Sequence, residues 1–80
     1  MKIFIDVNVF IDVMTKRNGW TESLRVLSLA RNSREIEGST SALTLITRNK
    51  KNFTASLLSV LTPDEWLKLP DVIALEAKLA

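Results

Sequence analysis

The chain has 80 residues, of which 11 are Lys or Arg and 9 are Asp or Glu, so its formal net charge is +2. It contains neither Cys nor His, which excludes disulfide bonds, thiolate chemistry, Cys- or His-bound metals and every mechanism that needs a His general base. Carboxylates are left as the acid–base and metal-binding side chains. The length fits one small domain, residues 1–80, and no apolar run is long enough to cross a membrane. A cytoplasmic location is therefore the default expectation.

Apolar periodicity and turn residues divide the chain into alternating strands and helices. In chain order, we expect a buried strand at 1–6, an apolar helix at 9–14, an amphipathic helix at 20–31, a strand at 39–47, one helical turn within 48–53 and a strand at 57–61. A helix then starts at 63, and a last helix at 72–79 follows a restart or kink at 70–71. The clearest local signal is Thr62 as N-cap, with Pro63 at the first helical position and Glu65 completing a capping box. The pattern predicts an α/β fold with a small, mostly parallel sheet of about three strands flanked by helices.

Four segments, in this order, resemble segments of PIN domains of the VapC-like toxin ribonuclease branch. The opening Ile-Phe-Ile-Asp-Val-Asn-Val-Phe-Ile-Asp at 3–12 is similar to the first strand of the family, its terminal Asp and the helix that follows. Residues 36–44 resemble its second strand, 45–53 its fourth strand and the next loop, and 60–67 its closing strand and helix. A long stretch that separates the second and fourth strands of the family is missing here. The chain therefore resembles a PIN domain that lacks its central part.

PIN domains are metal-dependent nucleases, so the resemblance implies a Mg²⁺ or Mn²⁺ site of three or four carboxylates at the carboxyl ends of the strands. Asp6 matches the first acid and is the remaining candidate metal ligand and catalytic residue. Its alternative role is to accept backbone N–H groups at the strand end. Asn8 also matches the motif, although an N-cap role is favoured for it. Three positions depart from the family pattern: Val7 replaces Thr or Ser, and Asn49 and Asn52 stand where Asp is frequent.

A lone carboxylate is a poor site for a divalent cation, so we expect neither tight Mg²⁺ or Mn²⁺ binding nor PIN-type catalysis from the isolated chain. Asp12 points away from this edge by helical phase and is expected to face water. Basic residues follow the first helix and the 39–47 strand, on the same edge as Asp6 if that strand is parallel to the first. They offer a phosphate-binding surface for RNA, although a solvated face is the favoured interpretation. These residues are Lys16, Arg17, Arg48, Lys50 and Lys51.

The 39–47 strand can occupy only one side of the first strand, which leaves a small sheet with one poorly covered face and open edges. We therefore expect a homo-oligomer, or a partner similar to the antitoxin proteins that lay a helix in a groove of VapC-like toxins. The favoured function is a degenerate PIN-like protein without nuclease activity that acts through protein association. One alternative is a Mg²⁺-dependent ribonuclease toxin whose acidic site is completed by oligomerisation. The other is a non-catalytic RNA-binding module.

Overall fold

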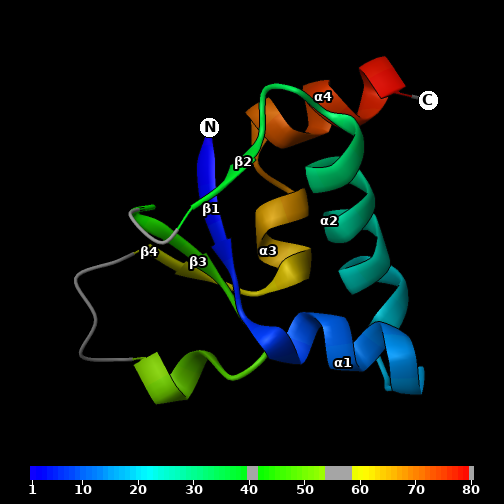
Figure 1. Ribbon diagram of the computed structural model, residues 1–80, viewed down its shortest axis with the longest axis vertical. Coiled ribbons are helices and arrows are strands. Elements are labelled where there is room, and N and C mark those ends of the chain that lie inside the picture. The colour runs from blue at the N-terminus through cyan, green and yellow to red at the C-terminus, as the bar shows by residue number, and fades with distance from the viewer. Residues whose placement is uncertain (40–41, 54–58, 80) are drawn as a thin grey trace.

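The computed structural model describes residues 1–39, 42–53 and 59–79. The elements, in chain order, are β1 (Lys2–Ile5), α1 (Val7–Thr15), α2 (Trp20–Asn32), β2 (Glu37–Gly38), β3 (Thr44–Ile46), the 3-10 turn η1 (Lys50–Phe53), β4 (Ser59–Leu61), α3 (Pro63–Leu67) and α4 (Pro70–Leu79). All described strand pairs are parallel, in the order β2-β1-β3-β4 (Figure 1). The fold is therefore α/β with a small parallel sheet, as the sequence predicts. Among the described residues, no helix has the length and apolar character needed to cross a membrane.

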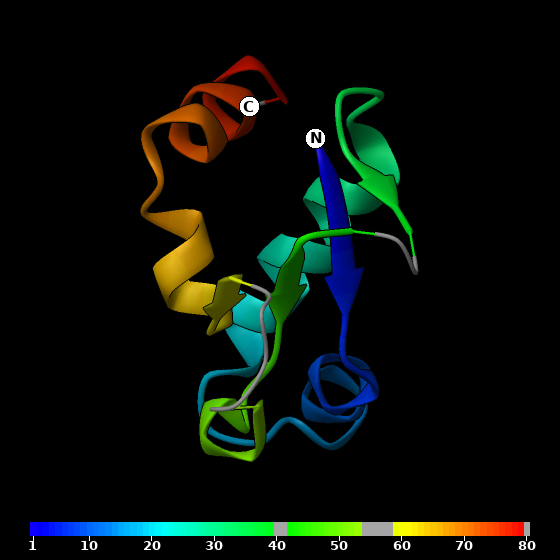
Figure 2. The same cartoon turned by 90° about the vertical axis from the view of Figure 1, so that its left-hand side faces the viewer.

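Helices α2 and α3 lie on one face of the sheet, and α1 runs along the edge where β1 ends (Figure 1). Figure 2 looks onto the other face, where the strands stand in front of α2. The core between the sheet and the helices is built from apolar side chains of nearly every element, with Trp66 the largest fully buried one. Its buried members are Ile3, Val9, Val26, Leu29, Ile36, Ile46, Trp66, Leu67, Val72 and Leu75.

The expectation of one continuous strand at 39–47 is wrong. Glu37–Gly38 pairs with β1 on one side, and Thr44–Ile46 pairs with β1 on the other, so the chain crosses from one edge of β1 to the other. This arrangement gives backbone partners to both edges of β1, which a single added strand would not do. The sheet consequently has four described strands rather than about three. Residues 40–41, in the middle of the predicted strand, lie outside the described residues.

The first helix begins at Val7, two residues earlier than a cap at Asn8 would allow, so that N-cap prediction is wrong. Asp6 is the N-cap residue of α1, and its backbone carbonyl accepts the Val9 N–H at 3.0 Å. The Asp6 side chain makes no capping hydrogen bond, so the alternative role expected for Asp6, acceptance of backbone N–H groups by its carboxylate, is not seen either. Asn8 lies inside the first turn, where its side chain is free to reach back to Asp6.

The capping box at the start of α3 is confirmed. The Thr62 hydroxyl accepts the Glu65 N–H, and the Thr62 N–H donates to Glu65 Oε1 at 2.9 Å. This backbone hydrogen bond, and then the hydrogen bond from the Lys50 ammonium, lower the pKa of Glu65 below its ordinary value. The predicted strand at 57–61 is described from Ser59 onward, and residues 57–58 lie outside the described residues.

Replacing Thr62 by Ala is expected to lower the free energy of unfolding by about 1 kcal/mol, because the hydroxyl that satisfies an orphan helix N–H is lost. Urea denaturation followed by circular dichroism measures the change. Thr21→Ala is the matched control, since the Thr21 hydroxyl lies exposed within α2 and donates to its neighbour Glu22. Equal changes for the two variants would contradict the capping role.

Candidate functional site

A short polar network around Asp6 joins the carboxyl ends of β1 and β3. The Thr47 hydroxyl donates to Asp6 Oδ2 at 2.6 Å, and Asn8 Nδ2 donates to the same oxygen at 3.2 Å. The Thr47 hydroxyl in turn accepts the Asn49 N–H at 3.1 Å, while the Asp6 N–H donates to the Ile46 carbonyl at 2.9 Å. Thr47 is fully buried. The candidate site acid is therefore held as a hydrogen-bond acceptor between two adjacent strands.

Asp12 does not face water, and that prediction is wrong. Asp12 is only 3% exposed. It lies on the side of α1 that packs against α2, so its side chain is covered by α2. Its Oδ2 accepts a hydrogen bond from the Ser23 hydroxyl at 3.4 Å and lies 3.5 Å from Arg48 Nε. A buried carboxylate needs such a counter-charge and such donors, because water no longer solvates it.

Gly19 leaves room for the Arg48 side chain. Its φ of +85° is in the region that favours glycine, and a Cβ at this position would come within 2.1 Å of Arg48 Nη1. The loop between α1 and α2 therefore helps to place the guanidinium beside Asp12. The Asp12–Arg48 pair thus brings together α1 and the segment that follows β3.

The side chains at this edge do not fit the divalent-cation centre that the PIN resemblance implies. Within residues 1–39, 42–53 and 59–79, no three acidic side chains come together as a metal-binding group. Asp6 accepts hydrogen bonds from a hydroxyl and an amide group. Asp12 is paired with the Arg48 guanidinium, a cation that would repel Mg²⁺. Val7 is exposed and offers no oxygen. The side chain of Asn52 lies outside what the structure describes.

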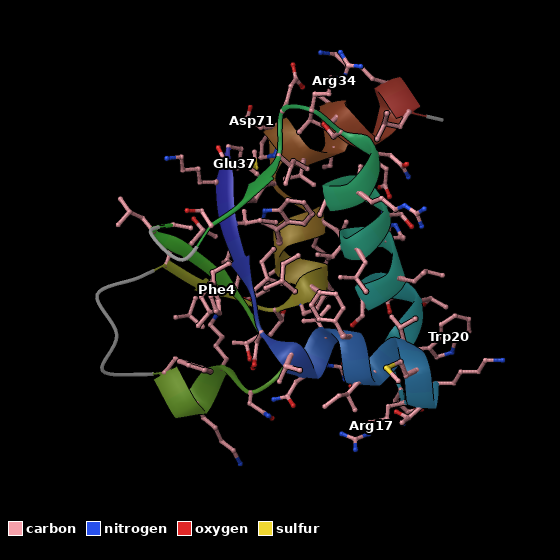
Figure 3. The ribbon with its side chains drawn as sticks, in the orientation of Figure 1. Phe4, Arg17, Trp20, Arg34, Glu37 and Asp71 are labelled. Atoms are coloured by element: carbon pink, nitrogen blue, oxygen red, sulfur yellow. The ribbon has the colours of Figure 1, made fainter. Side chains whose placement is uncertain are left out.

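Arg48, Lys50 and Lys51 follow β3, which ends at the same edge as β1 because the two strands are parallel, whereas Lys16 and Arg17 follow the far end of α1. Three of these five basic residues contact other side chains. Lys16 Nζ lies 5.9 Å from the Trp20 ring centroid, Arg48 pairs with Asp12, and Lys50 Nζ pairs with Glu65 Oε1 at 3.0 Å. Arg17 and Lys51 are exposed, and Figure 3 shows Arg17 at the end of α1 remote from β1. The positive charge available to phosphates is therefore smaller than the sequence count indicates.

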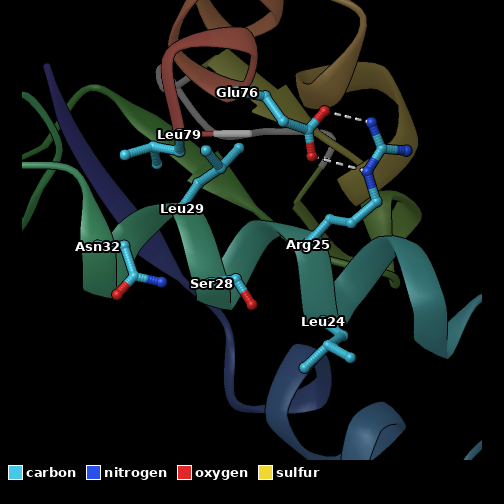
Figure 4. A pocket seen from close by; sticks show the side chains of 7 residues that line it. All are labelled: Leu24, Arg25, Ser28, Leu29, Asn32, Glu76 and Leu79. Atoms are coloured by element: carbon cyan, nitrogen blue, oxygen red, sulfur yellow. Dashed lines mark hydrogen bonds and ion pairs between the residues drawn. The ribbon is translucent and has the colours of Figure 1, made fainter.

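Two surface hollows lie away from Asp6. One, of about 390 Å³, is lined by Arg48, Glu22 and Asp64 among others. The other, of about 330 Å³, lies between α2 and α4, and its lining includes Leu24, Leu29 and Leu79 (Figure 4). An ion pair between Arg25 and Glu76 borders it; their hydrogen bond raises the pKa of Arg25 and lowers that of Glu76. Neither hollow includes the Asp6 network in its lining.

Comparisons of the chain with protein families, with curated proteins and with solved structures found no significant match. The site is therefore interpreted from its own geometry. Sequence reasoning missed Thr47, although a hydroxyl residue at the carboxyl end of the strand expected at 39–47 was a usable signal. It also missed the Asp12–Arg48 pair, for which the sequence offers no signal, because the two residues are brought together only by the packing of α1.

Thr47→Val is expected to lower the free energy of unfolding by about 2 kcal/mol, because the Asp6 carboxylate and the Asn49 N–H both lose a partner. In an Asp6→Asn background the same substitution should cost less, since the charged acceptor is already gone. Chemical denaturation of the four proteins in this double-mutant cycle measures the coupling. Additive effects would show that Thr47 and Asp6 do not interact in solution.

Arg48→Met is expected to destabilise the protein by about 2 kcal/mol, because the Asp12 carboxylate stays buried without its counter-charge. Lys51→Met removes a positive charge from the same edge where no ion pair is described, and should change stability by less than about 0.5 kcal/mol. Thermal or urea unfolding compares the two. Similar losses in both variants would mean that net charge, and not the buried pair, is responsible.

Proposed function

We propose that this chain is a degenerate PIN-like module without nuclease activity of its own, which acts through association with protein in the cytoplasm. The observation that supports the first part most strongly is that no three acidic side chains come together as a metal-binding group among the described residues. A divalent cation in a nuclease centre is held by several converging carboxylate oxygens, whereas Asp6 is approached by the Thr47 hydroxyl and the Asn8 amide. The absence of cysteine is in keeping with a reducing compartment, where disulfides do not stabilise small domains.

Association is supported by apolar side chains that the fold leaves in contact with solvent. Phe4 on β1 and three residues of α1, Val7, Phe10 and Met14, are all exposed. In a chain of this size the core is small, and large apolar side chains that cluster on one surface typically mark an interaction site. Figure 3 shows Phe4 on the side of β1 away from α2, which is the sheet face without a described helix.

The other two functions have less support. A ribonuclease completed by oligomerisation needs Asp6 carboxylates of several copies to approach one another, against their mutual repulsion and their existing hydrogen bonds. An RNA-binding module needs a basic surface, whereas Arg48 and Lys50 are already paired with acidic side chains. Salt-dependent RNA binding that is lost on neutralising Lys50 and Lys51 would favour the RNA-binding module.

Calorimetric titration of the protein with MnCl₂ should show no sub-millimolar site, because no three acidic side chains come together in the part of the chain that the structure describes. Asp6→Asn is expected to leave the titration unchanged, as is the control Asp71→Asn, which alters an exposed acid on α4. RNA incubated with the protein and Mn²⁺ should stay intact. A sub-millimolar site that Asp6→Asn abolishes and Asp71→Asn preserves would overturn the proposal.

A further inference from the structure

Helix α1 is apolar on nearly all sides, but only one side of it is packed. Six of its nine residues are apolar, and the side with Val9 and Asp12 is buried against the rest of the fold. The apolar stripe, defined here as Val7, Phe10 and Met14, follows the i, i+3, i+7 spacing of one helix face. These side chains are 61%, 45% and 81% exposed. A helix with apolar residues all round is normally buried on more than one side.

The apolar stripe continues onto the sheet. Phe10 and Phe4 line the same hollow of about 310 Å³, together with Ile5 at the end of β1. Phe4 is 40% exposed. The stripe and Phe4 therefore form one surface that spans α1 and β1, and its four members include no charged residue.

Charges of opposite sign stand at the two ends of the apolar stripe. Asp6 is the N-cap of α1, and within the described residues its Oδ1 has no hydrogen-bond donor. Arg17 lies just past the other end, where Figure 3 shows its side chain away from β1. The helix macrodipole is positive at the N-terminus, next to Asp6, and negative at the C-terminus, next to Arg17, so at each end its sign is opposite to that of the side chain. This surface is therefore complementary to itself when it is turned by two-fold rotation.

We infer that the apolar stripe docks a second copy of this chain, with the two α1 helices antiparallel across a two-fold axis. In that arrangement Phe10 and Met14 of each copy cover the stripe of the other, and each Arg17 approaches the Asp6 of the second copy, so every contact occurs twice. The stripe is about 10 Å long between Val7 and Met14, which suits a short helix-to-helix contact that extends onto Phe4. The inference rests on the proposed function, because it names the protein partner.

Sedimentation velocity over the micromolar range is the test. The wild type should sediment as a species of twice 9.0 kDa, and Met14→Glu should raise the dimer dissociation constant at least tenfold, since two carboxylates would enter the apolar contact. Arg17→Glu should also raise the dimer dissociation constant, because the new carboxylate would repel the Asp6 carboxylate of the second copy. The matched controls Ile73→Glu, on the exposed part of α4, and Arg34→Glu, beyond the end of α2, should leave it unchanged. Circular dichroism verifies that each variant is folded.

A folded 9.0 kDa monomer at high micromolar concentration would overturn the inference, and so would a dimer that Ile73→Glu separates and Met14→Glu does not. These outcomes are distinct from failure of the proposed function. If the protein is a monomer and has no Asp6-dependent Mn²⁺ site, the inference about the second copy is wrong. The proposal that the chain has no nuclease activity then still holds. An Asp6-dependent Mn²⁺ site overturns the proposed function whatever the oligomeric state.

Discussion

The hydrogen bond from the Thr47 hydroxyl to the Asp6 carboxylate connects three elements at one point. Asp6 directly follows β1 and is the N-cap residue of α1, while Thr47 directly follows β3. A buried hydroxyl without a partner would be costly, and so would a partly buried carboxylate without donors. Each of these groups satisfies the other, which fixes the direction in which α1 leaves the sheet. That direction determines which side of α1 packs against α2 and which side, the apolar stripe, meets solvent.

The same edge of the sheet shows why the acids present do not amount to a metal centre. A divalent cation is held where several carboxylate oxygens converge and no cation competes. Here one oxygen of Asp6 accepts hydrogen bonds from Thr47 and Asn8, and Asp12 accepts a hydrogen bond from Ser23 and pairs with Arg48. Both carboxylates thus contribute to joining elements of the fold. The described contacts of both carboxylates lie within the fold, and the exposed apolar surface beside them supports the proposal of a protein partner.

Local signals in the sequence predicted the elements whose causes are local. The Thr62–Glu65 capping box and the 3-10 turn after β3 depend on neighbouring residues, and both are present. The 39–47 segment was predicted as one strand because its β-forming residues are continuous, whereas pairing on both edges of β1 divides it. The environment of Asp12 was missed for a similar reason: helical phase shows which side of α1 it occupies, but not that α2 covers that side or that Arg48 arrives from beyond β3.

A crystal structure obtained in the presence of Mn²⁺, with anomalous diffraction data, tests the role of Asp6 most directly. The expected result is a Thr47 hydroxyl still bonded to the Asp6 carboxylate and no anomalous peak within coordinating distance of it. A peak bound by Asp6 together with other carboxylates, from one copy of the chain or from several, would contradict the structural role of Asp6 and restore a metal-dependent site.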